Sequence, residues 1–170
     1  KNTIKENKDS SVTLASTGGK IAGSNDGIDY LYYELTADKD FTITAKARVD
    51  AIKADKQVGF GLMVRAAVGE HGNTAEASPL NSTFVGASMK SATEVYNGNR
   101  KTPKNGYVGS AGIVDIAQGN TYDLCIQKVG SDIILSMQGI VIGTVAASDI
   151  IKGNTMYVGM FAARNCTITY

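Results

Sequence analysis

The chain has 170 residues but no tryptophan, one histidine, two prolines and two cysteines. The lack of tryptophan argues against a binding surface built from a flat row of indole rings. A catalytic triad could use only His71, and no GxSxG motif accompanies it. The two cysteines have no CxxC spacing and cannot form a metal site by themselves. These absences argue against most of the common catalytic and metal-binding arrangements.

Charge and hydropathy argue against two classes of partner. The 17 basic and 16 acidic side chains give a formal net charge of +1, which indicates no basic stripe for nucleic acid or for a membrane surface. No apolar run approaches the ~20 residues that span a bilayer. There is no initiator methionine and no signal-peptide core, so we expect an excised domain or a processed product.

The sequence instead has the turn signals of an all-β protein. Glycine is frequent, with 19 residues, and Asn-Gly, Asp-Gly and Gly-Asn pairs separate stretches in which apolar and polar residues alternate. A helical turn is expected over residues 147–153, capped by Ser148 and ended by Gly153. Strands are predicted over residues 11–16, 20–23, 29–35, 40–52, 57–66, 82–90, 105–112, 121–129, 132–138, 140–146, 155–163 and 166–170.

This spacing of strands predicts a two-sheet antiparallel β-sandwich. A single domain is expected over residues 1–170, with residues 1–10 as a linker or poorly ordered lead-in and residues 67–81 as a long surface loop. Cys125 and Cys166 lie within predicted strands, which favours two buried apolar side chains; a disulfide between neighbouring strands is the alternative. The buried core is expected to contain Phe41, Ile43, Val49, Phe60, Leu62, Leu124, Ile126, Leu135, Val158 and Met160.

The strand "QVGFGLMVRA", residues 57–66, has two unlike faces. Alternation places four apolar side chains on one face, which should point to the core: Val58, Phe60, Leu62 and Val64. The opposite face carries Gly59, Gly61, Met63 and Arg65. Glycines there would leave an open floor for a flat ring, and a solvent-facing arginine would supply N–H donors. The alternative is close packing against a neighbouring strand, with the arginine in an ion pair at the rim.

Five segments in a fixed order carry a resemblance to a known family: "GGKIAGSNDGIDYLYYEL", "DFTITAKARV", "QVGFGLMVRA", "YDLCIQKVGSDIILSMQG" and "MYVGMFAARNCTITY". The chain resembles the concanavalin A-like sandwich domains appended to bacterial secreted polysaccharide lyases and glycosidases, and levan-binding modules are similar in outline. The resemblance covers residues 11–170, and its most specific parts are the "FGLMVR" and "YVGMFAAR" strands. It implies a jelly roll of two antiparallel sheets that binds a glycan in a concave face or at a loop edge.

Three groups of residues are predicted to bind the glycan. One group is Arg65 with Met63. Another is Arg164 alone, at a strand end where relatives carry a polar residue, although an ion pair explains it as well. The largest group lies in the turn-rich stretch 94–109, which pairs aromatic rings with amide and guanidinium donors: Tyr96, Asn97, Asn99, Arg100 and Tyr107. Its alternative is a hairpin with a polar tip, because two Asn-Gly pairs favour hairpin turns.

No cofactor is predicted. Asn25, Asp26 and Asp29 have oxygen donors that suit calcium, but their spacing is not that of an EF-hand and Asp26-Gly27 is an ordinary turn signal. Because related sandwiches often carry a structural calcium, that alternative stays open. Catalysis has no support either. The ExDxE or ExDxxE strand of retaining glycosidases with this fold is absent, so no acid–base pair is indicated.

The sequence and the resemblance together predict a non-catalytic carbohydrate-binding module from a secreted or cell-surface bacterial protein. Its partners would be a polysaccharide or oligosaccharide and a tethered catalytic domain, near which it raises the concentration of substrate. Two alternatives belong to other classes: a structural or adhesive sandwich, and a small enzyme of the same fold with an unrecognised site.

Overall fold

The computed structural model describes residues 2–18, 27–53, 58–68, 82–89, 95–100, 108–111 and 116–170, with side chains for all of these except 88–89, 95–100 and 108–111. Its strands are β1 (Thr3–Glu6), β2 (Val12–Ser16), β3 (Asp29–Thr36), β4 (Phe41–Ile52), β5 (Val58–Arg65), β6 (Ser82–Met89), β7 (Val95–Arg100), β8 (Val108–Ala111), β9 (Thr121–Val129), β10 (Asp132–Met137), β11 (Ile140–Ala146), β12 (Thr155–Arg164) and β13 (Cys166–Thr169). A short helix, α1 (Ala147–Ile150), follows β11.

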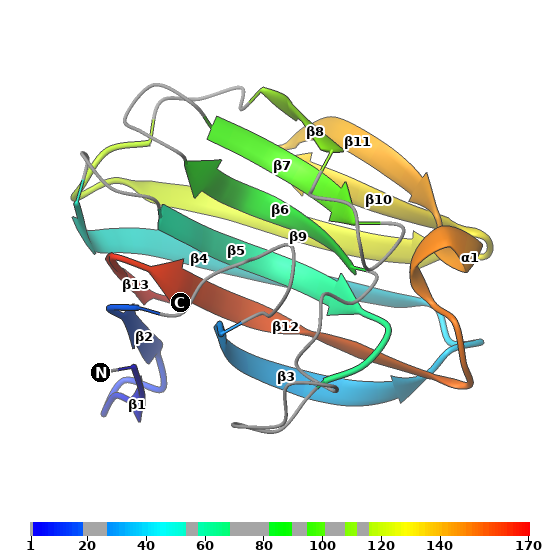
Figure 1. The fold of residues 1–170 in the computed structure, drawn as a ribbon, viewed down its shortest axis with the longest axis horizontal. Helices are drawn as coiled ribbons and strands as arrows, with labels where there is room; N and C mark the ends of the chain where they lie inside the picture. Colours follow the sequence, from blue (N-terminus) through cyan, green and yellow to red (C-terminus); the bar gives the residue numbers. More distant parts are fainter. Residues whose placement is uncertain are drawn as a thin grey trace.

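The strands form two sheets that stack face to face (Figure 1). The seven-stranded sheet has the order β1-β2-β13-β4-β9-β10-β11, and the six-stranded sheet has the order β3-β12-β5-β6-β7-β8. Neighbouring strands pair antiparallel throughout both sheets. The prediction of an all-β, two-sheet antiparallel jelly roll is confirmed. No helix among the described residues has the length and apolar character needed to cross a bilayer.

Three local predictions are wrong. Residues 1–10 are not a lead-in, because β1 pairs with β2 and places Thr3 opposite Ala15. The side chains of β1 are all exposed, so no burial pattern marked it as a strand. Helix α1 ends at Ile150 rather than Gly153, and its N-cap is Ala146 rather than Ser148.

The third error concerns residues 95–100, which form β7 between β6 and β8. Asn97 pairs with Ser110 and Gly98 with Gly109, so this Asn-Gly pair lies inside a strand and does not make a hairpin turn. The predicted strand 20–23 lies outside the described residues, as does most of the predicted loop 67–81.

The main core lies between the two sheets and confirms the assigned faces of β5. Val58, Phe60, Leu62 and Val64 are all buried in it. Of the other predicted core residues, Phe41, Ile43 and Met160 are half-buried and pack against its margin. The remaining ones are fully buried: Val49, Leu124, Ile126, Leu135 and Val158.

A second apolar cluster lies on the side of the six-stranded sheet that faces away from the main core. We call this side of the sheet the outer face. The cluster is built from Met63, Phe84, Phe161 and Ala163, each at most 1% exposed, with Ile28 and Tyr30 packed against them. The Phe84 and Phe161 rings meet edge to face, with centroids 5.4 Å apart. The outer face therefore has its own buried interior, and β5 is buried on both sides.

Glycine in β5 and β6 is required by close approach of the two backbones. Gly61 pairs with Gly86, and their φ angles are +144° and +141°. A Cβ atom on Gly61 would meet the carbonyl oxygen of Val85. The prediction that Gly61 leaves an open floor is wrong, and the alternative of close strand packing is the observed one.

Tyr170, the last residue of the chain, links the strands around Gly61 through hydrogen bonds of its hydroxyl group. The Tyr170 hydroxyl accepts a hydrogen bond from the Gly61 N–H at 2.8 Å and donates to the Phe161 carbonyl oxygen at 2.7 Å. Burial raises the pKa of Tyr170 well above its usual value, so the hydroxyl stays protonated. It thereby joins β13 to β5 and β12.

Both cysteines are free. Cys166 is buried as predicted, and burial raises the pKa of its thiol to about 12. Cys125 is half-buried on β9, so its predicted burial is only partial. The alternative of a disulfide is not what the structure contains.

Candidate functional site

Backbone pairing brings polar residues from five strands into one row across the outer face. From β3 to β7 this polar row reads Glu34, Tyr157, Arg65, Ser82 and Arg100. Adjacent positions in such a row are about 4.8 Å apart, the spacing of neighbouring strands. Directly paired residues project to the same side of a sheet. Among the residues whose side chains the structure describes, the row combines a carboxylate, a phenol, a guanidinium group and a hydroxyl at one end of the six-stranded sheet, and Arg100 holds the next backbone position in β7.

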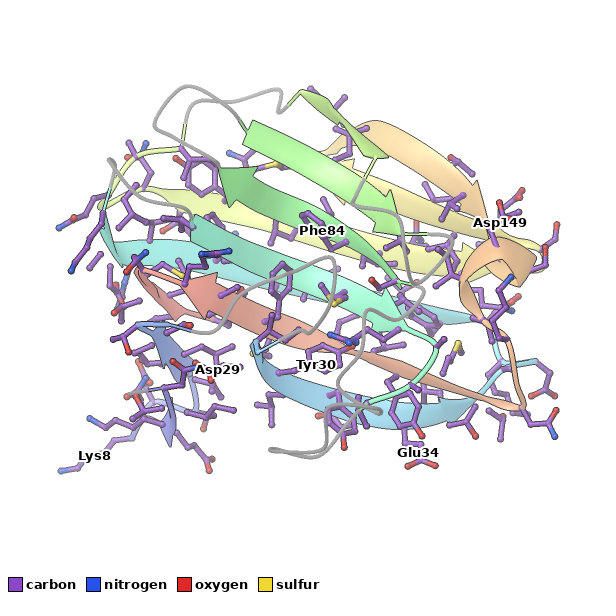
Figure 2. All side chains as sticks on the ribbon, in the orientation of Figure 1. Lys8, Asp29, Tyr30, Glu34, Phe84 and Asp149 are labelled. Atoms are coloured by element: carbon purple, nitrogen blue, oxygen red, sulfur yellow. The ribbon has the colours of Figure 1, made fainter. Side chains whose placement is uncertain are left out.

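A cluster of three tyrosines lies beside the β3 end of the polar row. The rings of Tyr30 and Tyr32 stack with centroids 5.2 Å apart, and Tyr157 meets Tyr32 edge to face at 5.5 Å. Tyr30 is anchored, since its hydroxyl lies 2.9 Å from the carbonyl oxygens of both Met63 and Tyr157. Tyr32 is 41% exposed, and Tyr157 is half-buried. Figure 2 labels Tyr30 and Glu34 on the six-stranded sheet. We call Tyr30, Tyr32 and Tyr157 the tyrosine cluster.

Arg65 and Met63 do not face solvent as predicted. Arg65 is 4% exposed and Met63 is 0% exposed. The Arg65 guanidinium carbon lies 5.9 Å from the centre of the Tyr30 ring, and its Nε donates to the Ala67 carbonyl oxygen at 3.3 Å. Met63 is part of the second apolar cluster, and Tyr30, which packs against that cluster, also contacts the Arg65 guanidinium. Arg65 thus supports the tyrosine cluster from within, and direct contact of either residue with a ligand stays a prediction.

The other predicted residues fall into three groups. Four of them lie in the stretch predicted to be rich in turns but belong to β7 and therefore to the same sheet: Tyr96, Asn97, Asn99 and Arg100. Tyr107 lies outside the described residues. Arg164 ends β12 opposite Val58, at the far end of β5 from Arg65. The fold thus places Arg65, Met63 and the β7 residues in one sheet and sets Arg164 apart from the polar row.

The residues that sequence reasoning missed are Tyr32, Glu34 and Tyr157. Glu34 is exposed and lies directly opposite Tyr157 in the β3–β12 ladder. The alternation of "DYLYYEL" does place Tyr30, Tyr32 and Glu34 on one side of a strand. The alternation alone does not show that this side of the strand belongs to the outer face, because that depends on how β3 pairs with β12.

Asp29 begins β3 and is a buried carboxyl group. Burial raises its pKa to about 6, although a hydrogen bond from Asn2 opposes the shift. Its Oδ2 atom has no hydrogen-bond partner among the described residues. Asn25 and Asp26, the other predicted oxygen donors, lie outside those residues. Within the described part of the chain, no three His, Cys, Asp or Glu side chains are grouped closely enough to hold a metal ion.

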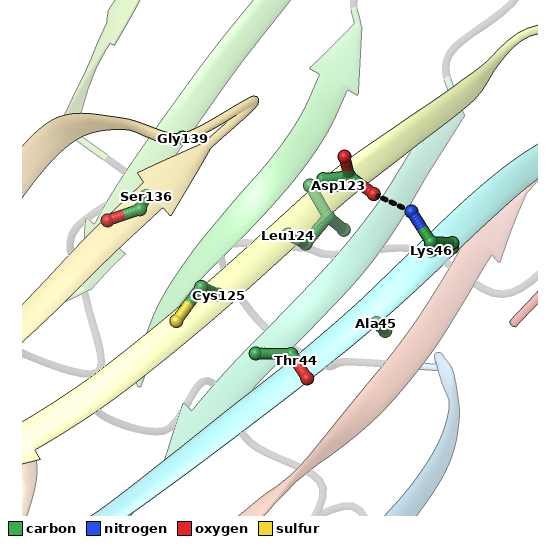
Figure 3. A pocket seen from close by; sticks show the side chains of 8 residues that line it. All are labelled: Thr44, Ala45, Lys46, Asp123, Leu124, Cys125, Ser136 and Gly139. Atoms are coloured by element: carbon green, nitrogen blue, oxygen red, sulfur yellow. Dashed lines mark hydrogen bonds and ion pairs between the residues drawn. The ribbon is translucent and has the colours of Figure 1, made fainter.

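A groove of about 540 Å³ lies on the opposite side of the molecule, on β4, β9 and β10 (Figure 3). An ion pair between Lys46 and Asp123 crosses it, with Nζ and Oδ1 2.6 Å apart. Burial raises the pKa of the neighbouring Cys125 thiol, which therefore stays protonated and poorly nucleophilic. Its lining contains no aromatic ring: Thr44, Ala45, Lys46, Asp123, Leu124, Cys125, Ser136 and Gly139. Because stacking rings are absent here, the tyrosine cluster is the stronger candidate site.

Solved structures define the class of fold. The chain resembles the carbohydrate-binding module CBM66 from Bacillus subtilis with a TM-score of 0.61 and 9% identity, covering 99% of this chain and 88% of that one. Lectin II from Ulex europaeus gives a TM-score of 0.63 with 14% identity, covering 99% and 88%. Alginate lyase A1-II', of polysaccharide lyase family 7, gives 0.61 with 13% identity, covering 98% and 78%. The fold is that of the concanavalin A-like jelly rolls, as the resemblance implied.

Sequence comparison then identifies the family. Residues 1–118 match the family model of the pectate disaccharide-lyase N-terminal domain, and the chain belongs to this family. It is 34% identical over 165 residues to pectate lyase L from Thermoclostridium stercorarium, covering 96% of this chain and 13% of that protein. It is 26% identical to a pectate disaccharide-lyase from Dickeya chrysanthemi, covering 93% and 26%. The chain thus spans about an eighth and a quarter of these two relatives.

Proposed function

We propose that this domain is a non-catalytic carbohydrate-binding module that holds a pectic polysaccharide beside an attached catalytic domain. The observation that carries the proposal is the tyrosine cluster, in which two rings at 81° to each other lie beside an exposed carboxylate. Aromatic faces stack on the C–H groups of pyranose rings, and a carboxylate accepts hydrogen bonds from hydroxyl groups. The buried Arg65 lies against the ring of Tyr30, and Tyr30 stacks on the exposed ring of Tyr32, so these contacts hold the surface in place.

The relatives support the choice of ligand and of partner. Both curated relatives are named as pectate lyases, and this domain corresponds to a small part of each. A binding domain joined to a lyase raises the effective concentration of polysaccharide at the catalytic site without making a new catalytic contact. Because these relatives are bacterial enzymes named for acting on a plant polysaccharide, we place the parent protein outside the cell, secreted or on the cell surface.

The proposed contact surface extends along the polar row. Tyr32, Tyr157 and Glu34 would meet the sugar first. β7 continues the same sheet, and its pairing with β6 puts Tyr96 and Arg100 in positions on the side of the polar row, so these two would contact further sugar units. Asn97 and Asn99 occupy the alternate positions of β7, and their contact with the sugar stays a sequence prediction. Arg65 and Met63 would act as supports from below, and the roles of Tyr107 and Arg164 remain sequence predictions. The ligand class is the one predicted from the sequence, but the centre of the proposed contact surface lies on β3 and β12 rather than on β5.

Isothermal titration with pectic oligosaccharides tests the proposal. Tyr32→Ala should weaken binding about fivefold, since an aromatic stack contributes about 1 kcal/mol. The matched control is Tyr33→Ala. Tyr33 is the next residue of β3, points to the other side of that strand and is 74% exposed. Equal binding by the wild type and Tyr32→Ala, or equal losses in the two variants, would reject the tyrosine cluster as the site.

A structural or adhesive role is the second candidate. On the inward side of β3, Leu31 and Tyr33 remain 40% and 74% exposed, although Leu35 on the same side packs against the core. Exposed apolar side chains in one strand favour contact with another protein. This candidate expects no glycan binding and a loss of protein association in Tyr33→Ala, which sedimentation of the isolated domain would detect.

A further inference from the structure

We infer that the tyrosine cluster selects uncharged sugar units, including methyl-esterified uronates, over sugars that carry a free carboxylate. This inference rests on the proposed function and adds to it the chemical class of the ligand. It follows from where the charged groups of the outer face lie relative to the exposed rings.

The accessible charge beside the rings is negative. Glu34 is exposed, lies opposite Tyr157 in the ladder and is two residues from Tyr32 on the same side of β3. No ion pair neutralises it among the described residues. Its carboxylate can accept hydrogen bonds from sugar hydroxyls, whereas a second carboxylate brought to the same place would be repelled.

The cation next to Tyr157 in the polar row is buried. Arg65 occupies the position next to Tyr157 in the polar row, but it is only 4% exposed. Its guanidinium lies over the Tyr30 ring, and its Nε is bonded to the Ala67 carbonyl oxygen. A sugar that stacks on the outer surface of the rings therefore does not reach the donors of Arg65.

The next arginine in the row is too far away to change this balance. Arg100 pairs with Ser82, which places it three strand spacings from Tyr157, or about 14 Å. Glu34 is one spacing from Tyr157, or about 5 Å. Along the polar row, a unit stacked on the tyrosines therefore lies closer to the Glu34 carboxylate than to the backbone position of Arg100.

The size of the effect can be stated in advance. Two carboxylates about 5 Å apart in water repel by about 0.8 kcal/mol, which corresponds to a fourfold change in affinity. A methyl ester removes the charge and leaves the ring face and the hydroxyls of the uronate unchanged. The domain should therefore bind a methyl-esterified oligogalacturonide about four times more tightly than the free acid of the same length.

Titration calorimetry with these two oligosaccharides tests the inference in the wild type, in Glu34→Gln and in Asp38→Asn. Glu34→Gln keeps an acceptor oxygen but removes the charge, so it should abolish the fourfold preference for the ester and make the ratio of the two affinities about one. Asp38→Asn is the control, because Asp38 is another exposed carboxyl in the turn that follows β3. It should change neither affinity.

Each remaining outcome has a defined meaning. Preference for the free acid, with an affinity that falls steeply with salt and is lost in Arg100→Gln, would overturn the inference while the proposed function stands. Equal binding of both oligosaccharides that Glu34→Gln does not change would overturn it as well. If neither binds, the proposed function itself is rejected. Circular dichroism of each variant confirms that the sheets are intact.

Discussion

The outer faces of the two sheets are built from the same alternating strands but have opposite character. On the six-stranded sheet, Met63, Phe84 and Phe161 are fully buried on the side away from the main core. On the seven-stranded sheet, the corresponding side of β4 presents Thr44 and Lys46 to solvent. Strands with a similar alternation can therefore be buried on one side, as in β4, or on both, as in β5.

The two sheets also differ in whether their charged side chains are buried or exposed. Arg65 is enclosed on the six-stranded sheet and lies against an aromatic ring, whereas Lys46 and Asp123 form an exposed ion pair across an open groove. Enclosed charges hold neighbouring groups in fixed positions, while exposed pairs contribute little because water competes for both partners. This difference favours the six-stranded sheet as the pre-arranged surface.

The largest expected effect tests whether the second apolar cluster behaves as a true core. Phe84→Ala should lower the free energy of unfolding by about 3–5 kcal/mol, the same range as Phe60→Ala in the main core, because both rings are 0% exposed. Thr44→Ala on the other outer face should change it by less than about 0.5 kcal/mol. Urea denaturation measures all three variants. A small loss in Phe84→Ala alone would show that the cluster is only loosely packed.

The next effect compares the two cations. Arg65→Ala should cost about 2–3 kcal/mol, since it removes a charged hydrogen-bond donor and the contact of the guanidinium with the Tyr30 ring. Lys46→Ala should cost less than about 1 kcal/mol, because its ion pair with Asp123 is exposed. Thermal denaturation measures both. If Arg65→Ala leaves the melting temperature unchanged but weakens glycan binding, Arg65 contacts the ligand directly.

The smallest effect concerns pH, and its sign differs between the sheets. On β3, burial raises the pKa of Asp29 from 3.8 to about 6, so the folded protein binds this proton more tightly than the unfolded chain. Its contribution to stability is complete below about pH 4 and is lost as pH rises through 6. We expect a loss of about 1–2 kcal/mol across this range, less than two full units would give, because the carboxyl is not wholly shielded from water.

Asp50 on β4 should act in the opposite direction. Burial alone would raise its pKa, but hydrogen bonds from Arg48 and Thr169 lower it below 3.8. Its contribution is present above pH 4 and is lost as pH falls through the lowered pKa. Urea denaturation between pH 2.5 and pH 8 tests both. Asp29→Asn should abolish the decline between pH 4 and 6, and Asp50→Asn should reduce the decline at acid pH. Unchanged slopes in both variants would contradict these assignments.

Apolar alternation was enough to predict the strands in which it is strong and the side on which they meet the main core. In β5 and β9, alternate positions are large and apolar, so burial of one side is enforced by the pattern alone. It missed β1 and β7, whose residues are mostly polar or small and have no such pattern. The structure forms these strands because neighbouring strands offer hydrogen-bond partners, a property that the segment does not carry in itself.

The position of the candidate site depends on tertiary contacts that no local sequence pattern contains. Tyr157 is more than 120 residues away from Tyr30 and Tyr32 in the sequence, and the antiparallel register of β3 with β12 brings it beside them. The same register encloses Arg65 instead of exposing it, because alternation says which residues share a side but not what covers that side. The ligand-facing surface therefore depends on which strands become neighbours, and that is set by the packing of the whole sandwich.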